Sequence, residues 1–160
     1  MTEGLDGRKV LVERPWSVEY KFTLGEGEAE DSEGLGPDGW ALVVTSSGGV
    51  ELRVVVDTYW NPTSGDRSGN CLRIEVDGAE VEDGQAYVPT PMDDGKEHHL
   101  LLSNLPGGRV MAVGHCRRGE PVVIYHVFDC PFPEEEDLSF EVEEVGNGRA
   151  EVDRVGFVSL

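Results

Sequence analysis

The stretch "GGVELRVVVDTYWNPTSGD" (residues 48–66) carries the pattern that decides the fold and opens the question of function. Two glycines lead into alternating and then continuous apolar residues, which is typical of a β-strand over residues 50–58. Oxygen-bearing side chains follow at once, and Pro62 and Gly65 interrupt them. The strand is therefore followed either by an ordinary polar loop or by a site that holds a ligand.

The rest of the chain repeats this pattern. Apolar residues recur with period two or in short blocks bounded by Gly, Pro, Asp and Asn, and no stretch of a dozen residues keeps a helical period. The pattern predicts an all-β chain, and strands of this length separated by "DG", "GG" and "NG" turns favour a two-sheet antiparallel β-sandwich. We expect strands at residues 8–12, 16–24, 39–45, 50–58, 71–77, 79–82, 85–89, 97–104, 108–115, 121–128, 137–145 and 151–159.

Length and composition limit the classes of protein. The 160 residues fit one domain, 1–160, and a domain of this size buries about 70% of the surface that its unfolded chain exposes. No apolar run approaches the roughly 20 residues of a membrane-spanning helix, so we expect no membrane insertion. The first residues lack the pattern of a secretory signal, so either the chain has none or it begins after one. The compartment stays open at this point.

The net charge excludes one class of partner. The chain has 13 Lys and Arg against 32 Asp and Glu, which gives a formal net charge of −19. Proteins that bind nucleic acids need basic patches to neutralise phosphates. We therefore expect neither DNA nor RNA as a partner.

The cysteines and histidines carry little signal for a metal site or a disulfide framework. Cys116 and Cys130 could join across a hairpin, which would leave Cys71 over. Adjacent residues of a strand face opposite sides, so His98 and His99 are not expected to share a metal. The two remaining histidines stand alone in the sequence and are predicted to be hydrogen-bonded structural residues, namely His115 and His126.

The oxygen atoms after residue 56 suit a hard cation. Ca²⁺ takes six to eight oxygen ligands from carboxylates, amide and backbone carbonyls and water. The side chains of Asp57, Asn61 and Asp66, with the carbonyl of Tyr59, supply about half of such a shell. A turn stabilised by Asx hydrogen bonds explains the same spacing without a metal, so the residues alone leave both interpretations open.

Three segments in order change the balance between these interpretations. "PDGWALVV" (37–44), "GGVELRVVVDTYWNP" (48–62) and "HHLLLSNLPGGRVMAV" (98–113) occur in the order in which L-type lectins carry related segments. The chain resembles the legume-lectin superfamily over residues 16–160 and looks most like its animal cargo-receptor branch. The resemblance implies a concanavalin-like antiparallel β-sandwich, or jelly roll.

The resemblance also implies a metal site. It assigns Ca²⁺ to the side chains of Asp57, Asn61 and Asp66 and to the carbonyl of Tyr59. The second, transition-metal site of the plant branch is expected to be absent, because Val55 stands where that site has an acid.

The resemblance further implies a sugar site. In the family an Asp, the metal-loop Asn and a glycine N–H grip one monosaccharide, and a strained cis peptide precedes that Asp. The matching positions are Asp38, after Pro37, with Asn61 and either Gly48 or Gly49. Trp60 is a candidate for the apolar face of the sugar. The last binding loop would be Gly146, Asn147 and Gly148.

A rival hypothesis is catalytic. The segment "EVDGAE" (75–80) has the E-x-D-x-x-E spacing of the catalytic strand in laminarinase-like glycoside hydrolases. Glu75 and Glu80 would then be the paired carboxylates of a retaining mechanism. Against this, Asp77 and Gly78 form a hairpin-turn dipeptide that would end the strand between them.

The sequence therefore predicts calcium-dependent binding of a glycan or glycoprotein without catalysis, and mannose is the sugar that the resemblance suggests. A sandwich whose sugar site has decayed is the second interpretation and the hydrolase is the third. A lectin of this kind would be secreted or would work in the lumen of the secretory pathway.

Overall fold

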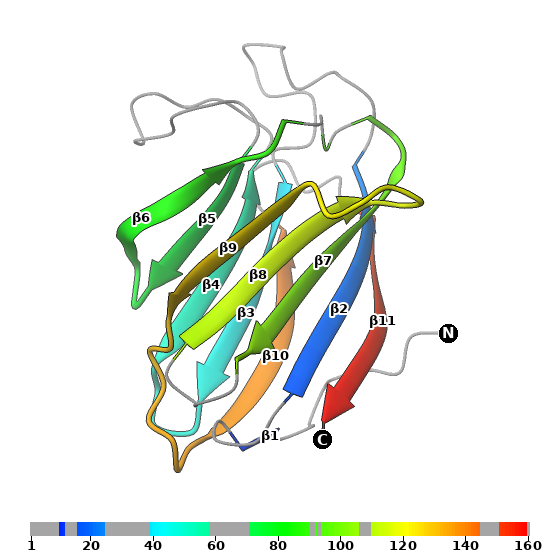
Figure 1. Cartoon of the computed structure of the whole chain (residues 1–160). Helices are drawn as coiled ribbons and strands as arrows, with labels where there is room; N and C mark the ends of the chain where they lie inside the picture. The colour runs from blue at the N-terminus through cyan, green and yellow to red at the C-terminus, as the bar shows by residue number, and fades with distance from the viewer. Residues whose placement is uncertain are drawn as a thin grey trace.

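A computed structural model gives the fold (Figure 1). It describes residues 16–24, 39–57, 71–89, 92, 94–105 and 110–143, and only the backbone of residues 10–11, 144 and 151–159. The described residues form two antiparallel sheets, and the five-stranded sheet lies in front of the six-stranded sheet in Figure 1. The all-β, concanavalin-like sandwich is confirmed. In this part of the chain no helix is long and apolar enough to cross a membrane.

The six-stranded sheet has β3 and β4 at its centre, and every neighbouring pair is antiparallel. Its strands in spatial order are β1 (Val10–Leu11), β10 (Asp137–Glu144), β3 (Gly39–Ser46), β4 (Glu51–Asp57), β5 (Cys71–Val76) and β6 (Ala79–Tyr87).

The five-stranded sheet covers one face of the first. Its strands in spatial order are β11 (Glu151–Ser159), β2 (Trp16–Thr23), β7 (Glu97–Asn104), β8 (Val110–Arg117) and β9 (Ile124–Asp129).

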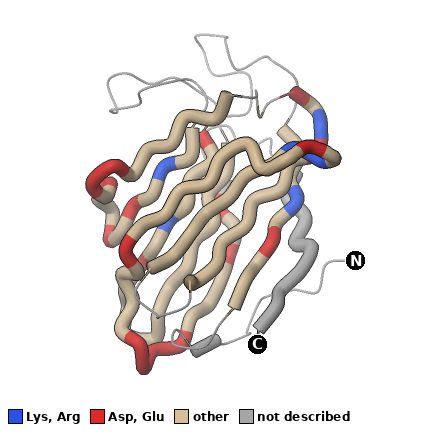
Figure 2. The backbone as a smooth tube through the Cα atoms, in the orientation of Figure 1, with Lys and Arg blue, Asp and Glu red and all other residues tan. Residues whose placement is uncertain are grey.

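The alternation of apolar residues fixes which face of each strand is buried. In β2, Trp16, Val18, Tyr20 and Phe22 point into the core, while the residues between them are partly exposed. Side chains of a strand alternate between the two faces of its sheet, so one face of each sheet supplies the core. Acidic residues gather in the connection between β9 and β10, at Glu134, Glu135 and Glu136 (Figure 2).

The central strands of the six-stranded sheet are buried on both faces. Leu52, Val54 and Val56 belong to the main core. On the opposite, outer face Ala41, Val43 and Val55 form a second, smaller cluster in which no side chain is more than 2% exposed. This explains the continuous apolar run in β4, since a strand buried on both faces has no need of alternation.

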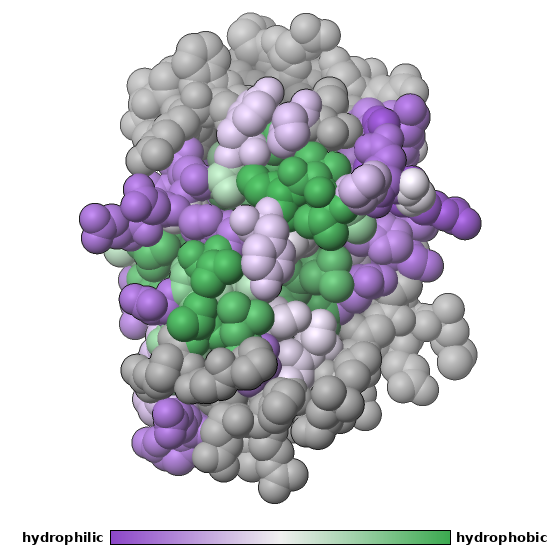
Figure 3. Space-filling view, in the orientation of Figure 1, coloured by the Kyte–Doolittle hydropathy of each residue, from purple (hydrophilic) through white to green (hydrophobic). Residues whose placement is uncertain are grey.

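The five-stranded sheet shows apolar side chains on its outer face, which faces the viewer in Figure 3. Tyr125 and Val127 of the edge strand β9 are 59% and 46% exposed. Gly114 and Ala112 of β8 are their register partners, so small residues lie beside these larger side chains.

Strand β6 differs from the prediction of two strands at 79–82 and 85–89. It is continuous from Ala79 to Tyr87, but its pairing with β5 shifts between Glu75, opposite Glu80, and Arg73, opposite Gln85. The extra residues form a bulge, a feature that period-two patterning does not show.

The structure answers what the sequence left open about the cysteines, and it shows His115 as the hydrogen-bonded structural residue that was predicted. No disulfide joins the three cysteines: Cys116 is on the outer face of β8, whereas Cys130 is buried against the core. His98 and His99 face opposite sides, as predicted. His115 does not stand alone, because its Nε2 lies 3.0 Å from Nδ1 of His98 in the core. The pairing was missed because β7 and β8 bring residues 17 positions apart together.

Candidate functional site

The register of the six-stranded sheet brings three predicted segments to one end of it. Gly39 at the start of β3 is the partner of Asp57 at the end of β4. Glu144 at the end of β10 is the partner of Trp40. The segments that precede residue 39 and follow residues 57 and 144 therefore begin at the same end of neighbouring strands. We call this end of the sheet, marked by Gly39, Asp57 and Glu144, the Asp57 end.

Gly39 enters β3 in a way that only glycine allows. Its φ is +127°, and a Cβ at this position would collide with the backbone carbonyl of Val56 on the neighbouring strand. Left-handed backbone and close approach of two chains are the two conditions that select glycine. The "DG" motif thus has a local cause in the pairing of β3 with β4.

Asp57 is a buried carboxylate with a cationic partner. The residue is 6% exposed, and it faces the outer side of the sheet because Val56 points into the core. Its Oδ2 accepts a hydrogen bond from Nη1 of Arg73 on β5 at 2.9 Å. Nε of Arg73 donates to Oε2 of Glu75 at 2.7 Å. One guanidinium therefore bridges the carboxylates of two neighbouring strands.

The electrostatics of this bridge favour the charged state of Arg73. Burial disfavours the charged guanidinium, but the hydrogen bonds to Glu75 and Asp57 outweigh it and raise the pKa of Arg73 further. The side chains of Arg73 and Asp57 are only 18% and 9% exposed. Such a partly buried, charge-assisted pair is stronger than an exposed one.

Known structures share this architecture at low sequence identity. Lectin I-B4 from Griffonia simplicifolia, in its metal-free form, matches with a TM-score of 0.70 and 14% identity over 95% of this chain and 77% of that one. The Bauhinia forficata lectin in complex with GalNAc gives 0.71 and 10% over 96% and 76%. The Ca²⁺/Man3GlcNAc-bound exoplasmic/lumenal domain of VIP36 gives 0.63 and 15% over 94% and 69%. The chain has the L-type lectin fold.

The solved structures that resemble this chain include both legume lectins and the VIP36 domain. They confirm, at the level of the fold, the predicted resemblance to L-type lectins and to their cargo-receptor branch. No family model matches the chain. No curated protein sequence matches it either.

The surroundings of Asp57 show whether this part of the L-type lectin fold can hold Ca²⁺. It is the one predicted ligand among the described residues, since Tyr59, Asn61 and Asp66 lie outside them. Its carboxylate already has a guanidinium 2.9 Å away, and a second cation there would be repelled. Within the described residues no three His, Cys, Asp or Glu side chains are grouped for a metal. This part of the site therefore does not fit calcium.

Gly48 and Gly49 are not part of the same end of the sheet. They lie in the turn between β3 and β4, beyond Ser46, and strand β3 separates them from Gly39. Seven residue steps along a strand span roughly 23 Å. The N–H of Gly48 also donates to Oε1 of Glu136 at 3.1 Å. This placement speaks against the prediction that one of these glycines grips the sugar beside Asp38.

The remaining predicted sugar residues of the L-type lectin interpretation are Asp38, Trp60, Asn61, Gly146, Asn147 and Gly148, all outside the described residues. The predicted cis peptide between Pro37 and Asp38 also lies there.

Tyr87 is an exposed aromatic residue at the Asp57 end of the sheet. It ends β6 opposite Cys71, the register partner of Asp57, and it is 62% exposed. An exposed aromatic ring can cover the apolar face of a ligand. The sequence alone did not single it out, because its position beside Asp57 depends on the register of β4, β5 and β6.

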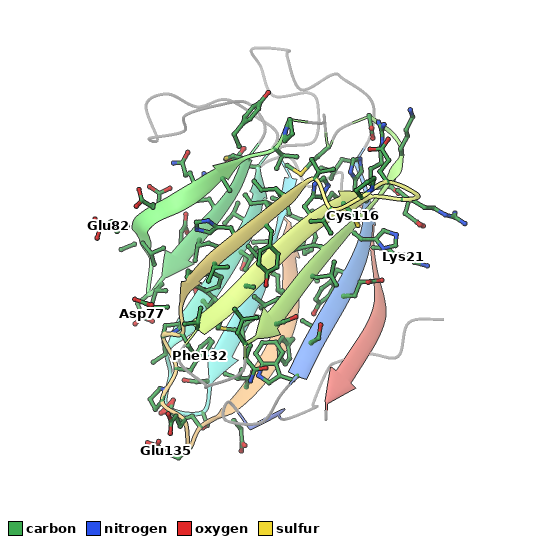
Figure 4. All side chains as sticks on the ribbon, in the orientation of Figure 1. Lys21, Asp77, Glu82, Cys116, Phe132 and Glu135 are labelled. Carbon is green, nitrogen blue, oxygen red and sulfur yellow. The ribbon has the colours of Figure 1, made fainter. Side chains whose placement is uncertain are left out.

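The "EVDGAE" segment has the geometry of a hairpin. Asp77, labelled in Figure 4, and Gly78 have φ of 51° and 86° and form the turn between β5 and β6. Glu75 and Glu80 are cross-strand partners on two strands. The single catalytic strand that the hydrolase hypothesis requires is therefore not present. Asp77 instead accepts a hydrogen bond from the N–H of Glu51 at 2.9 Å.

Proposed function

We propose that this protein binds carbohydrate, without cleaving it, at the Asp57 end of the six-stranded sheet. The observation that carries the proposal is the register. Gly39, the last residue of "PDG", is opposite Asp57, the residue before "TYWNP". Glu144, which precedes the "GNG" segment, is opposite Trp40. The three segments therefore enter or leave the sheet at the same end. The solved lectins with this fold include forms bound to GalNAc and to Man3GlcNAc.

The residue types at these positions suit a sugar. In the proposal, the carboxylate of Asp38 accepts hydrogen bonds from two neighbouring hydroxyls, and the amide of Asn61 donates to a third oxygen. Trp60 offers an aromatic face to the apolar side of the ring. Gly146, Asn147 and Gly148 contribute a loop whose glycines let the backbone approach the ligand closely.

The sugar class and the metal are finer parts of the proposal. Mannose is the sugar that the resemblance favours. The resemblance assigns Ca²⁺ to Tyr59, Asn61 and Asp66 together with Asp57, but the contact of Asp57 with Arg73 speaks against the ion there, so the proposal does not require calcium. A glycan or glycoprotein is the proposed partner, with no nucleic acid. The secretory lumen or the exterior of the cell is the proposed compartment.

A glycan array tests the proposal. The full chain is applied in Ca²⁺ and in chelator, so that a metal requirement is measured separately from sugar binding. We expect selective binding of a subset of glycans and no cleavage of β-glucans on long incubation. Binding to no glycan in either buffer would favour a sandwich whose sugar site has decayed. Cleavage that disappears in a Glu75→Gln, Glu80→Gln double variant would favour the hydrolase.

A further inference from the structure

We propose that the guanidinium of Arg73 stands at Asp57 in place of a calcium ion, so that this L-type lectin fold keeps the Asp57 end of its sheet in order without the metal. The proposal deepens the proposed function and rests on it for its relevance to sugar binding. Its physical basis is the contact between two strands of the six-stranded sheet.

The first argument is the need of Asp57 for a cation. Its side chain is 9% exposed, and an ionised carboxylate removed from water is costly unless a positive group or several donors meet it. Nη1 of Arg73 meets it at 2.9 Å. Arg73 therefore already supplies the positive charge that a calcium ion would bring to Asp57.

The second argument is that Arg73 is fixed from both sides. While Nη1 bonds Asp57, Nε donates to Glu75 at 2.7 Å, so two donors of the same planar fork are used. In the register of β4 and β5, Arg73 lies opposite Val55, which is 2% exposed. The guanidinium is therefore held in place by carboxylates from both β4 and β5.

The third argument is exclusion. Ca²⁺ binds carboxylate oxygens at 2.3–2.6 Å. A divalent ion bound to the Asp57 carboxylate would lie close to a cation that is itself hydrogen-bonded to that carboxylate, in a partly buried setting where repulsion is weakly screened. Arg73 and a calcium ion therefore compete for Asp57.

A second arginine on the same face provides a matched control. Arg53 donates to both oxygens of Glu143, at 3.2 and 2.9 Å, and lies 3.6 Å from Glu51. Its side chain is 22% exposed, close to the 18% of Arg73. Arg53 thus has similar burial and a similar bridging role, but its carboxylate partners do not include Asp57.

The experiment compares thermal unfolding of the full chain in saturating Ca²⁺ and in EDTA for three proteins: wild type, Arg73→Met and Arg53→Met. A ligand that binds only the folded state raises the melting temperature, by roughly 5–10 °C for a domain of this size at a hundredfold excess over its dissociation constant. We expect no Ca²⁺ response from wild type or Arg53→Met. Arg73→Met should melt lower in EDTA and recover part of the loss in Ca²⁺, because Asp57 then lacks its cation.

Two outcomes would overturn the inference: stabilisation of wild type by Ca²⁺, or an Arg73→Met protein that Ca²⁺ leaves unchanged. If Arg73→Met does not fold, Arg73→Gln, which removes the charge and keeps a polar side chain, replaces it. Calorimetric titration of wild type with Ca²⁺ alone gives an independent reading.

Glycan binding that requires Ca²⁺ would overturn the role of Arg73 and leave sugar binding intact. Absence of glycan binding would remove the proposed function, while the melting comparison would still decide the role of Arg73.

Discussion

Arg73 donates a hydrogen bond from β5 to the carboxylate of Asp57 on β4 at 2.9 Å, across the outer face of the six-stranded sheet. The contact places a fixed positive charge on the residue from which the "TYWNP" segment starts. It also joins β4 and β5, the two strands that flank the "TYWNP" segment in the sequence.

Removal of the charge of Asp57 is expected to destabilise the fold. In Asp57→Asn the guanidinium of Arg73 keeps Glu75 but loses one charged partner in a partly buried position. We expect the free energy of unfolding to fall by roughly 2–3 kcal/mol. Glu143→Gln is the control, and because Glu143 is 53% exposed it should cost less than about 1 kcal/mol. Urea unfolding with unchanged m-values measures both, and equal losses in the two variants would contradict the account.

Gly39→Ala is expected to be one of the most damaging small substitutions. The new methyl group would collide with the carbonyl of Val56, and the backbone has φ of +127°. We expect a loss of at least about 3 kcal/mol. Gly49→Ala has φ of +95° but no atom within 4 Å of the new Cβ, so strain alone should cost it about 1 kcal/mol. A Gly39→Ala protein as stable as Gly49→Ala would show that β3 and β4 are not so close.

Buried His115 makes stability depend on pH. His98 Nε2 lies 2.8 Å from Asp94, whose other oxygen lies 3.4 Å from Arg117, and His98 Nδ1 lies 3.0 Å from His115 Nε2. With both rings neutral, His98 donates to Asp94 and accepts from His115. Burial, with the neighbouring His98 second, lowers the pKa of His115 from 6.5 to about 4.

The direction of the pH effect follows from this lowered pKa. Above the unfolded pKa neither state of the chain protonates His115, so stability is complete there. As the pH falls from 6.5 towards 4, the unfolded chain takes up a proton that the folded chain refuses. Stability should therefore fall by up to about 1.4 kcal/mol per pH unit in this window. Urea unfolding across it should show a smaller slope for His115→Gln than for wild type. His126→Gln, on the edge strand β9, is the control and should keep the wild-type slope. A slope of His115→Gln equal to the wild-type slope would contradict the account.

The proposed sugar site is tested by one substitution outside the described residues. Asp38→Asn keeps the shape of the side chain and removes its charge, so the sugar hydroxyls lose a charge-assisted acceptor. We expect glycan affinity to fall by roughly ten- to a hundredfold, or about 1.5–3 kcal/mol, with little change in stability. Asp129→Asn, on β9 of the other sheet, is the matched control. Equal affinity of the two variants for the glycan would move the site elsewhere.

The features that the sequence predicted are those that depend on neighbouring residues. Period-two alternation located most strands within two or three residues, and the Asp77-Gly78 dipeptide located the β5–β6 turn, where both residues have positive φ. The glycine of "PDG" was identified by motif, and its collision with the backbone of Val56 gives the physical reason.

The features that the sequence missed depend on the register between strands. Arg73 comes 16 positions after Asp57, and only the pairing of β4 with β5 brings them together. The same register sends Gly48 and Gly49 to the far end of β3. The bulge in β6 and the pair of His98 with His115 were likewise invisible to local patterns.

The central claim, that the Asp57 end of the sheet binds carbohydrate and does so without calcium, is tested most directly by one titration. The glycan that binds most strongly on the array is titrated calorimetrically into the full wild-type chain, once in EDTA and once in Ca²⁺. The account predicts saturable one-site binding with the same affinity in both buffers, and weaker binding by Asp38→Asn. Binding of no glycan in either buffer, or binding only in Ca²⁺, would contradict it.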